Sequence, residues 1–158
     1  MGFEIERKWL IKELPEGIGG FPHKEYVQGY LCTEPTVRVR QEGDEYVLTY
    51  KGAGMLKREE YNLPLTEVSF RHLITKCDGR LIHKTRYFIP LSDQKGLTIE
   101  LDVYKGELSG LMTAEIEFPS EAEAVGFEAP DWFSEDVSLR PEYKNSALAM
   151  DDTLDILP

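Results

Sequence analysis

Hydrophobic and polar residues alternate one by one along most of this chain. Alternation with a period of two is typical of β-strands, because successive side chains of a strand point to opposite faces. Turn-forming residues occupy several of the breaks, as in EGDE, GAG and SDQKG. The pattern predicts about eight strands, at residues 3–11, 25–31, 36–41, 45–51, 57–63, 80–89, 97–104 and 111–118.

Three stretches carry helical patterns instead. Residues 66–77 space apolar side chains along one helix face, behind Thr66 as a candidate N-cap. Residues 120–128 begin with Ser120 in the register of a capping box, and residues 140–150 have a proline where a first helical turn tolerates one. Many short strands with few helices predict an α+β fold, built on an antiparallel sheet or barrel rather than on βαβ units.

Many charged residues of the predicted strands share one face of their strand, and on several strands that face carries charges of a single sign. Charged positions of this face are cationic in residues 36–41 and anionic in residues 97–104 and 111–118. One interpretation is an ordinary solvated sheet face, but such faces usually mix signs, because like charges opposite one another repel. Segregation favours an inward, ligand-binding face. Its cations are Lys8, Arg38, Arg40, Lys51, Arg58, Lys84 and Arg86, and its acids are Glu4, Glu6, Glu60, Glu100, Asp102, Glu115 and Glu117.

A closed barrel of about eight strands can hold one small ligand, and helices would then cover its apolar outer face. An interior with so many charges is too costly when dry, so it would need water, ions or a charged ligand. Carboxylates without His or Cys partners are typical of Mg²⁺ or Mn²⁺ sites, and clustered Arg and Lys match phosphate oxygens. Both sets in one cavity predict a polyphosphate chelated to divalent metal.

Length, charge and cysteine content narrow the function further. The 158 residues are the size of one domain, so we expect a single unit over residues 1–158. The net charge of −11 argues against nucleic-acid binding, although concentrated basic residues can still bind a small polyanion. No apolar run predicts a membrane span, and two scattered cysteines fit a reducing cytoplasm. An apolar barrel exterior could support a homodimer.

The charged motifs also resemble a known family, the CYTH or triphosphate tunnel metalloenzymes. The hallmark of that family is an N-terminal Glu-x-Glu-x-Lys, present here as Glu4, Glu6 and Lys8. The resemblance implies an eight-stranded antiparallel barrel that forms a tunnel, with divalent metal and triphosphate inside. It runs nearly end to end, in the family's order, through QGYL (28–31), VRVR (37–40), TYKG (49–52), REEY (58–61), HKTRY (83–87), IELDVYKG (99–106), EIEFP (115–119) and YKNSALA (143–149).

The resemblance implies a role for each charged residue. The main metal ligands would be Glu4, Glu6, Glu115 and Glu117, with Glu60, Glu100 and Asp102 contributing directly or through water. The phosphate-binding residues would be Lys8, Arg38, Arg40, Lys51, Lys84 and Arg86, with Arg58 as a weaker candidate. The catalytic set would be Glu4, Glu6, Lys8 and Glu117. Lys144 would lie on a C-terminal helix that plugs one tunnel mouth, and Asn62 departs from the family, which often has Glu at that position.

The expected activity is hydrolysis of inorganic tripolyphosphate to pyrophosphate and phosphate, with two Mg²⁺ or Mn²⁺ ions. Alternatives are hydrolysis of thiamine triphosphate or nucleoside triphosphates, class IV adenylate cyclase activity, or polyphosphate binding without turnover. The carboxylates favour catalysis over binding alone, because binding needs only the cations. The sequence names no general base. Trp9 falls on the apolar face and is predicted to be core rather than a stacking platform.

Overall fold

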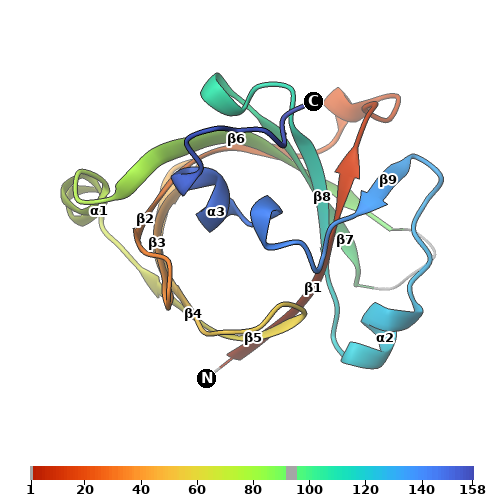
Figure 1. The fold of residues 1–158 in the computed structure, drawn as a ribbon, viewed down its shortest axis with the longest axis horizontal. Coiled ribbons are helices and arrows are strands. Elements are labelled where there is room, and N and C mark those ends of the chain that lie inside the picture. The colour runs from red at the N-terminus through yellow and green to blue at the C-terminus, as the bar shows by residue number, and fades with distance from the viewer. Residues whose placement is uncertain (1, 92–95) are drawn as a thin grey trace.

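The computed structural model of the protein describes residues 2–91 and 96–158, so residues 92–95 of the predicted turn at 92–96 lie outside the described part. Antiparallel strands wrap into a closed barrel (Figure 1). The strands are β1 (Gly2–Ile11), β2 (His23–Cys32), β3 (Thr36–Glu42), β4 (Glu45–Lys51), β5 (Lys57–Pro64), β6 (Asp78–Pro90), β7 (Thr98–Tyr104), β8 (Met112–Glu117) and β9 (Phe133–Asp136). The order around the barrel is β1-β5-β4-β3-β2-β6-β7-β8, and β8 pairs with β1 again. The predicted eight-stranded barrel is confirmed.

Strand β1 is shared between three partners. Its residues 2–5 pair with β5, and its residues 6–10 pair with β8. Where β1 leaves β5, its free edge is taken by β9, which pairs Phe133 with Ile11. Strand β9 is not predicted from the sequence, because FSED has only four residues and no clear alternation. This ninth strand lies outside the barrel wall.

The helices are α1 (Glu67–Ile74), α2 (Glu121–Gly126) and α3 (Asn145–Met150), with 3₁₀ turns at Ile18–Gly20, Gly106–Leu108 and Pro141–Tyr143. The first two helices begin at their predicted caps. The backbone N–H of Ser69 donates to Thr66 Oγ1 at 3.1 Å, and that of Glu123 donates to Ser120 Oγ at 3.2 Å. Side-chain caps of this kind satisfy amide groups that the first helical turn leaves without partners.

The predicted helix at 140–150 is divided, and this part of the prediction was wrong. A 3₁₀ turn comes first, then Lys144 in an extended conformation (φ −66°, ψ 143°), and only then α3. The extended residue interrupts the helical hydrogen bonds. The carbonyl oxygen of Tyr143 instead accepts a hydrogen bond from Lys8 Nζ at 2.7 Å, so an interaction with the barrel interior takes its place.

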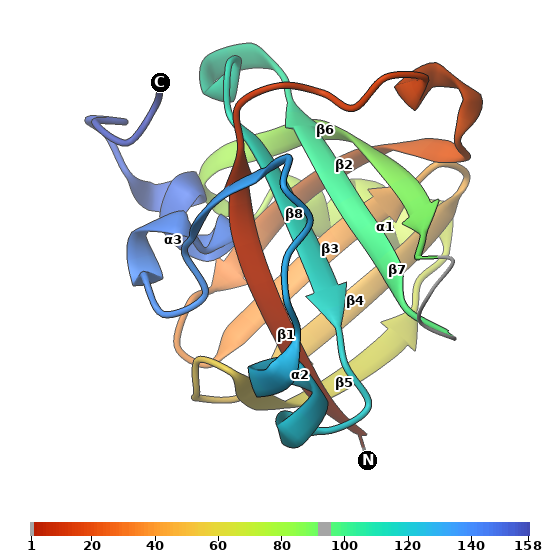
Figure 2. The same ribbon diagram turned by 90° about the vertical axis from the view of Figure 1, so that its right-hand side faces the viewer.

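An outer core covers one side of the barrel, where α2 and β9 pack on β1 (Figure 2). Trp9 is only 2% exposed, and its ring lies 4.9 Å from that of Phe133 and 5.7 Å from that of Phe127. Arg7 stacks over Trp9 and donates to the carbonyls of Ala124 and Phe127, which fixes α2 to the strand. The outward apolar face and the core position of Trp9 are as predicted.

An inner core closes one end of the barrel. Tyr30, Ile82 and Tyr104 from the wall pack against Tyr143 and Leu148 of the C-terminal segment. Figure 1 looks into the ring of strands with α3 inside its outline, and Figure 2 places α3 at one end. The helix therefore plugs one mouth, as the resemblance implies. Among the described residues, the helices are too short or too polar to cross a membrane.

Candidate active site

The charged faces of the strands line one cavity of about 250 Å³ inside the barrel. All of the predicted metal and phosphate ligands border it except Asp102, and Lys144 and Asn62 border it as well. The cavity ends at the plug, where Tyr143 and Asn145 contribute to its wall. These charged side chains face the interior, so the alternative of a solvated outer sheet face does not hold.

The acids gather on neighbouring strands. Strands β7, β8 and β1 are adjacent, and their register places Glu100 opposite Glu115 and Glu6 opposite Glu117. Like charges in directly opposed positions are unfavourable. Within the described part of the chain, neither Glu6 nor Glu117 forms a salt bridge with Lys or Arg. We call Glu6, Glu100, Glu115 and Glu117 the acid wall.

Two members of the acid wall bind protons unusually tightly. Burial raises the pKa of Glu117 to about 7, reinforced by nearby carboxylates. Burial also raises the pKa of Glu6 well above its usual range, and the neighbouring Glu115 adds to this effect. Glu115 itself behaves differently: burial alone would raise its pKa, but Lys8 and Arg86 hold it well below the usual value. Glu6 and Glu117 therefore hold protons more readily than ordinary carboxyl groups do, and a bound cation would have to displace those protons.

The β4–β5 side of the cavity carries tightly paired charges. Lys51 Nζ donates to both carboxylate oxygens of Glu4 at 2.9 Å and lies 3.6 Å from Glu60. Arg58 lies 3.7 Å from Glu4. Both cations border the cavity, so a bound anion can contact them while they hold the acids.

Arginine side chains of β3 point into the same cavity. Arg38 donates from Nη2 to Thr49 Oγ1 at 3.2 Å, whereas its buried Nε has no hydrogen-bond partner among the described residues. Arg40 donates to Glu42 and lies over the ring of Tyr26 at 4.8 Å. A buried donor without a partner is costly, so the Nε of Arg38 favours a ligand that accepts hydrogen bonds.

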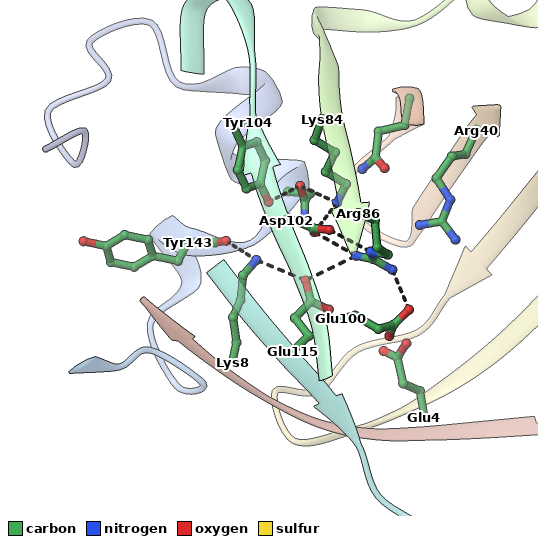
Figure 3. A network of polar contacts seen from close by, with 12 residues as sticks. Glu4, Lys8, Arg40, Lys84, Arg86, Glu100, Asp102, Tyr104, Glu115 and Tyr143 are labelled. Atoms are coloured by element: carbon green, nitrogen blue, oxygen red, sulfur yellow. Dashed lines mark hydrogen bonds and ion pairs between the residues drawn. The ribbon is translucent and has the colours of Figure 1, made fainter. Parts of the chain in front are cut away.

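Strand β6 supplies a second cationic group, which Figure 3 shows around Asp102. Arg86 donates from Nε and Nη2 to the two oxygens of Asp102 at 2.7 and 2.8 Å, and from Nη1 to Glu100 at 2.9 Å. Lys84 donates to Asp102 at 2.7 Å. Burial lowers the pKa of Lys84 to about 7, in spite of the attraction of Asp102.

The plug segment also touches the cavity cations. Lys8 Nζ, bonded to the Tyr143 carbonyl, lies 3.7 Å from Glu115. Lys144 Nζ donates to the carbonyl of Gly54 at 3.2 Å. Five residues that contact the cavity cations are not predicted as site residues from the sequence, namely Tyr26, Glu42, Thr49, Tyr143 and Asn145. A signal existed for most of them, since Glu42 and Thr49 continue the charged faces of β3 and β4, and Asn145 follows Lys144 directly.

The carboxylate oxygens of the acid wall are the kind of ligand that binds a hard divalent cation. Within the described residues, no three acidic, His or Cys side chains converge as a finished metal site. The acid wall offers oxygen ligands only, as Mg²⁺ and Mn²⁺ prefer, and opposes like charges that a cation would neutralise.

Comparison with known proteins identifies the family. A model of the CYTH domain matches residues 2–148. The chain belongs to the CYTH domain family. It is 44% identical over 152 residues to an inorganic triphosphatase of Nitrosomonas europaea, covering 93% of this chain and 97% of that protein. An inorganic triphosphatase of Acetivibrio thermocellus is 38% identical over 158 residues, covering 94% of each chain.

A solved structure agrees with the family assignment. The crystal structure of the inorganic triphosphatase NE1496 aligns with a TM-score of 0.70 at 40% identity, covering 96% of this chain and 97% of that one. The predicted resemblance to CYTH proteins is confirmed, together with the barrel fold. The roles of individual cavity residues stay predictions.

Proposed function

We propose that this CYTH protein is a divalent-metal-dependent inorganic triphosphatase, which hydrolyses tripolyphosphate to pyrophosphate and phosphate. The observation that carries the proposal is the cavity itself, in which the acid wall, with its carboxyl groups on adjacent strands, shares one space with buried arginines and lysines. The inorganic triphosphatases of the two related bacterial chains support it.

The cations would bind and orient the phosphate chain. Arg38 offers its unpartnered Nε, and Arg40 and Arg86 present guanidinium groups already fixed by carboxylates and by the ring of Tyr26. Donors held in place before the substrate arrives stabilise charge that develops on the transferred phosphoryl group and on the departing pyrophosphate. Arginine suits this task because its planar fork matches two phosphate oxygens.

The acid wall, together with Glu4, would hold two Mg²⁺ or Mn²⁺ ions. Glu60, which also borders the cavity, would contribute directly or through water. Bound ions of this kind neutralise phosphate oxygens and lower the pKa of a bound water. Glu6 and Glu117 must release their protons before they can act as ligands, and nearby cations such as Lys51 favour the ionised forms. We assign no general base, because several carboxylates border the same space.

The dimensions of the cavity favour an inorganic substrate. Its volume of about 250 Å³ lies just under the roughly 300–1,000 Å³ that is usual for sites of drug-sized ligands. A second, mostly apolar cavity of about 760 Å³ adjoins it through Met55, Arg58 and Lys144, and is lined by Tyr50 and Met150. This second cavity could hold an apolar group attached to the phosphate chain, so an organic triphosphate, such as thiamine triphosphate or a nucleoside triphosphate, is the second candidate substrate.

The test is phosphate release by the purified protein with Mg²⁺, with Mn²⁺ and with a chelator. Tripolyphosphate should be hydrolysed with metal and not with the chelator. Glu4→Gln should lower kcat/KM by about 10²-fold or more, a loss typical of removing a preorganised charged group from an active site. Glu128→Gln, which changes an exposed acid outside the cavity, is the matched control. Equal turnover in chelator, or none with tripolyphosphate, would refute the proposal.

We also propose a reducing compartment such as the cytoplasm, supported by the free thiols of Cys32 and Cys77. The proposed partner is the small triphosphate rather than nucleic acid, because many of the chain's cations face the cavity while the net charge of the chain is −11. A homodimer stays a prediction. Size-exclusion chromatography with light scattering would test it.

A further inference from the structure

Asp102 lies behind the cavity wall rather than on it. Its side chain is 0% exposed, and it does not border the cavity. Oδ1 accepts a hydrogen bond from Arg86 Nε, and Oδ2 accepts from Arg86 Nη2 and from Lys84 Nζ, all at 2.7 to 2.8 Å (Figure 3). A carboxylate has about four lone-pair sites, so three are already occupied. Little capacity is left for a metal ion or a water bound to one.

Glu100 shows the contrast on the same strand. It lies two residues before Asp102 on the same face of β7, but it borders the cavity and its side chain is 26% exposed. It accepts one hydrogen bond, from Arg86 Nη1. Of the two neighbouring acids, Glu100 therefore presents free oxygen lone pairs to the cavity and Asp102 presents its oxygens to cations.

We propose that Asp102 is a positioning residue, which fixes Arg86 and Lys84 for phosphate binding, and is not a metal ligand. This inference rests on the proposed function and refines it, since the family resemblance implies a ligand role for Asp102. The guanidinium of Arg86 is held by two parallel hydrogen bonds, a geometry that restricts both its position and its plane. Lys84 is almost fully buried, and a buried ammonium needs a nearby carboxylate to remain charged.

The plug helix completes this arrangement. Asn145, the first residue of α3, accepts hydrogen bonds through Oδ1 from Tyr104 Oη at 2.8 Å and from Lys84 Nζ at 3.4 Å. The ammonium of Lys84 is thus held from β7 by Asp102 and from the plug by Asn145. The third direction faces the cavity, where Lys84 contributes to the lining. A phosphate oxygen in the cavity would occupy that remaining direction.

The experiment separates metal binding from substrate use. Mn²⁺ affinity is measured without substrate, by electron paramagnetic resonance, for the wild type, Asp102→Asn and Glu117→Gln. Asp102→Asn should bind Mn²⁺ within twofold of the wild type, while its kcat/KM for tripolyphosphate falls at least tenfold. Glu117→Gln should lose at least tenfold in Mn²⁺ affinity. If Glu117→Gln keeps wild-type Mn²⁺ affinity, the metal site of the proposed function fails. A tenfold loss of Mn²⁺ affinity in Asp102→Asn overturns the positioning role, whatever Glu117→Gln does.

A double-mutant cycle tests whether Asp102 acts through Arg86. Arg86→Lys keeps the positive charge but removes the fork that Asp102 holds. If Asp102 acts through this side chain, the double variant should lose no more than about twofold in kcat/KM beyond the worse single variant. Independent, fully multiplied losses would contradict the inference.

A measurement on the wild type covers the case in which Asp102→Asn does not fold. In crystals of the wild type soaked with Mn²⁺, the anomalous peaks should lie beside Glu6 and Glu117, with Asp102 still bonded to Arg86 and Lys84. An Asp102 oxygen bonded to Mn²⁺, directly or through one water, overturns the inference.

Discussion

Replacing Glu117 with Gln should remove a defined part of the pH dependence of metal binding. Burial and neighbouring carboxylates raise the pKa of this group to about 7 in the metal-free protein, so half of the molecules hold a proton there at neutral pH. A carboxylate must be ionised to bind a metal ion, and the ion therefore competes with the proton. Raising the pH through 7 should strengthen binding.

The magnitude follows from the ionised fraction. For one group with a pKa of about 7, that fraction rises from about 0.09 at pH 6 to about 0.91 at pH 8, so the apparent metal affinity rises about tenfold. Glu6 also has a raised pKa and adds its own pH dependence, which is present in both proteins. The ratio of wild-type to Glu117→Gln affinity isolates the contribution of Glu117. Water reaches this side chain, so tenfold is the upper value.

The assay is isothermal titration of Mn²⁺ into wild type, Glu117→Gln and the control Glu128→Gln at pH 6, 7 and 8. Repeating the pH 7 titration in two buffers with different ionisation enthalpies gives the number of protons released. The wild type should release about 0.5 proton more than Glu117→Gln. An affinity ratio that stays constant from pH 6 to 8, with equal proton release, would refute the assignment of a raised pKa to this site.

Other predictions concern stability and phosphate binding. Trp9→Ala should cost about 3–5 kcal/mol of unfolding free energy, read from urea denaturation, whereas exposed Val125→Ala should change it by less than about 0.5 kcal/mol; similar losses would contradict the outer core. The metal-free protein should lose thermal stability as the pH rises from about 4.5 to 7, because its folded state retains protons on Glu117 and Glu6 that the unfolded chain releases. A melting temperature that rises over this range would contradict these pKa shifts. Arg40→Ala should lower kcat/KM for tripolyphosphate at least tenfold with an unchanged circular dichroism spectrum, and full activity would exclude Arg40 from the site.

The sequence predicts the barrel well because its alternation is regular. Most strands of the barrel carry apolar side chains on one face and charged ones on the other, so a single choice of inward face places Glu4, Lys8 and Arg40 in one cavity. Strand β9 escapes prediction because it pairs with β1 only at the barrel's outer edge, and edge pairing leaves no period in a four-residue segment.

The sequence predicts which strand face a charged residue occupies more readily than it predicts which other charged residue it pairs with. Asp102 and Glu100 lie on the same face of β7, yet Asp102 is fully buried behind the cavity wall and Glu100 borders the cavity. The difference depends on how far along the barrel axis each residue lies and on the inner core around Tyr104, which only the three-dimensional structure provides. The break at Lys144 likewise depends on a distant partner, the Lys8 ammonium that takes the Tyr143 carbonyl.

The most direct test of a metal-dependent triphosphatase is a phosphorus NMR time course of tripolyphosphate with the wild-type protein. With Mg²⁺ present, pyrophosphate and orthophosphate should appear in equal amounts while tripolyphosphate disappears, and excess chelator should stop the reaction. Tripolyphosphate that binds but persists unchanged in the presence of Mg²⁺ or Mn²⁺ would contradict the proposed hydrolysis and indicate a binding protein instead.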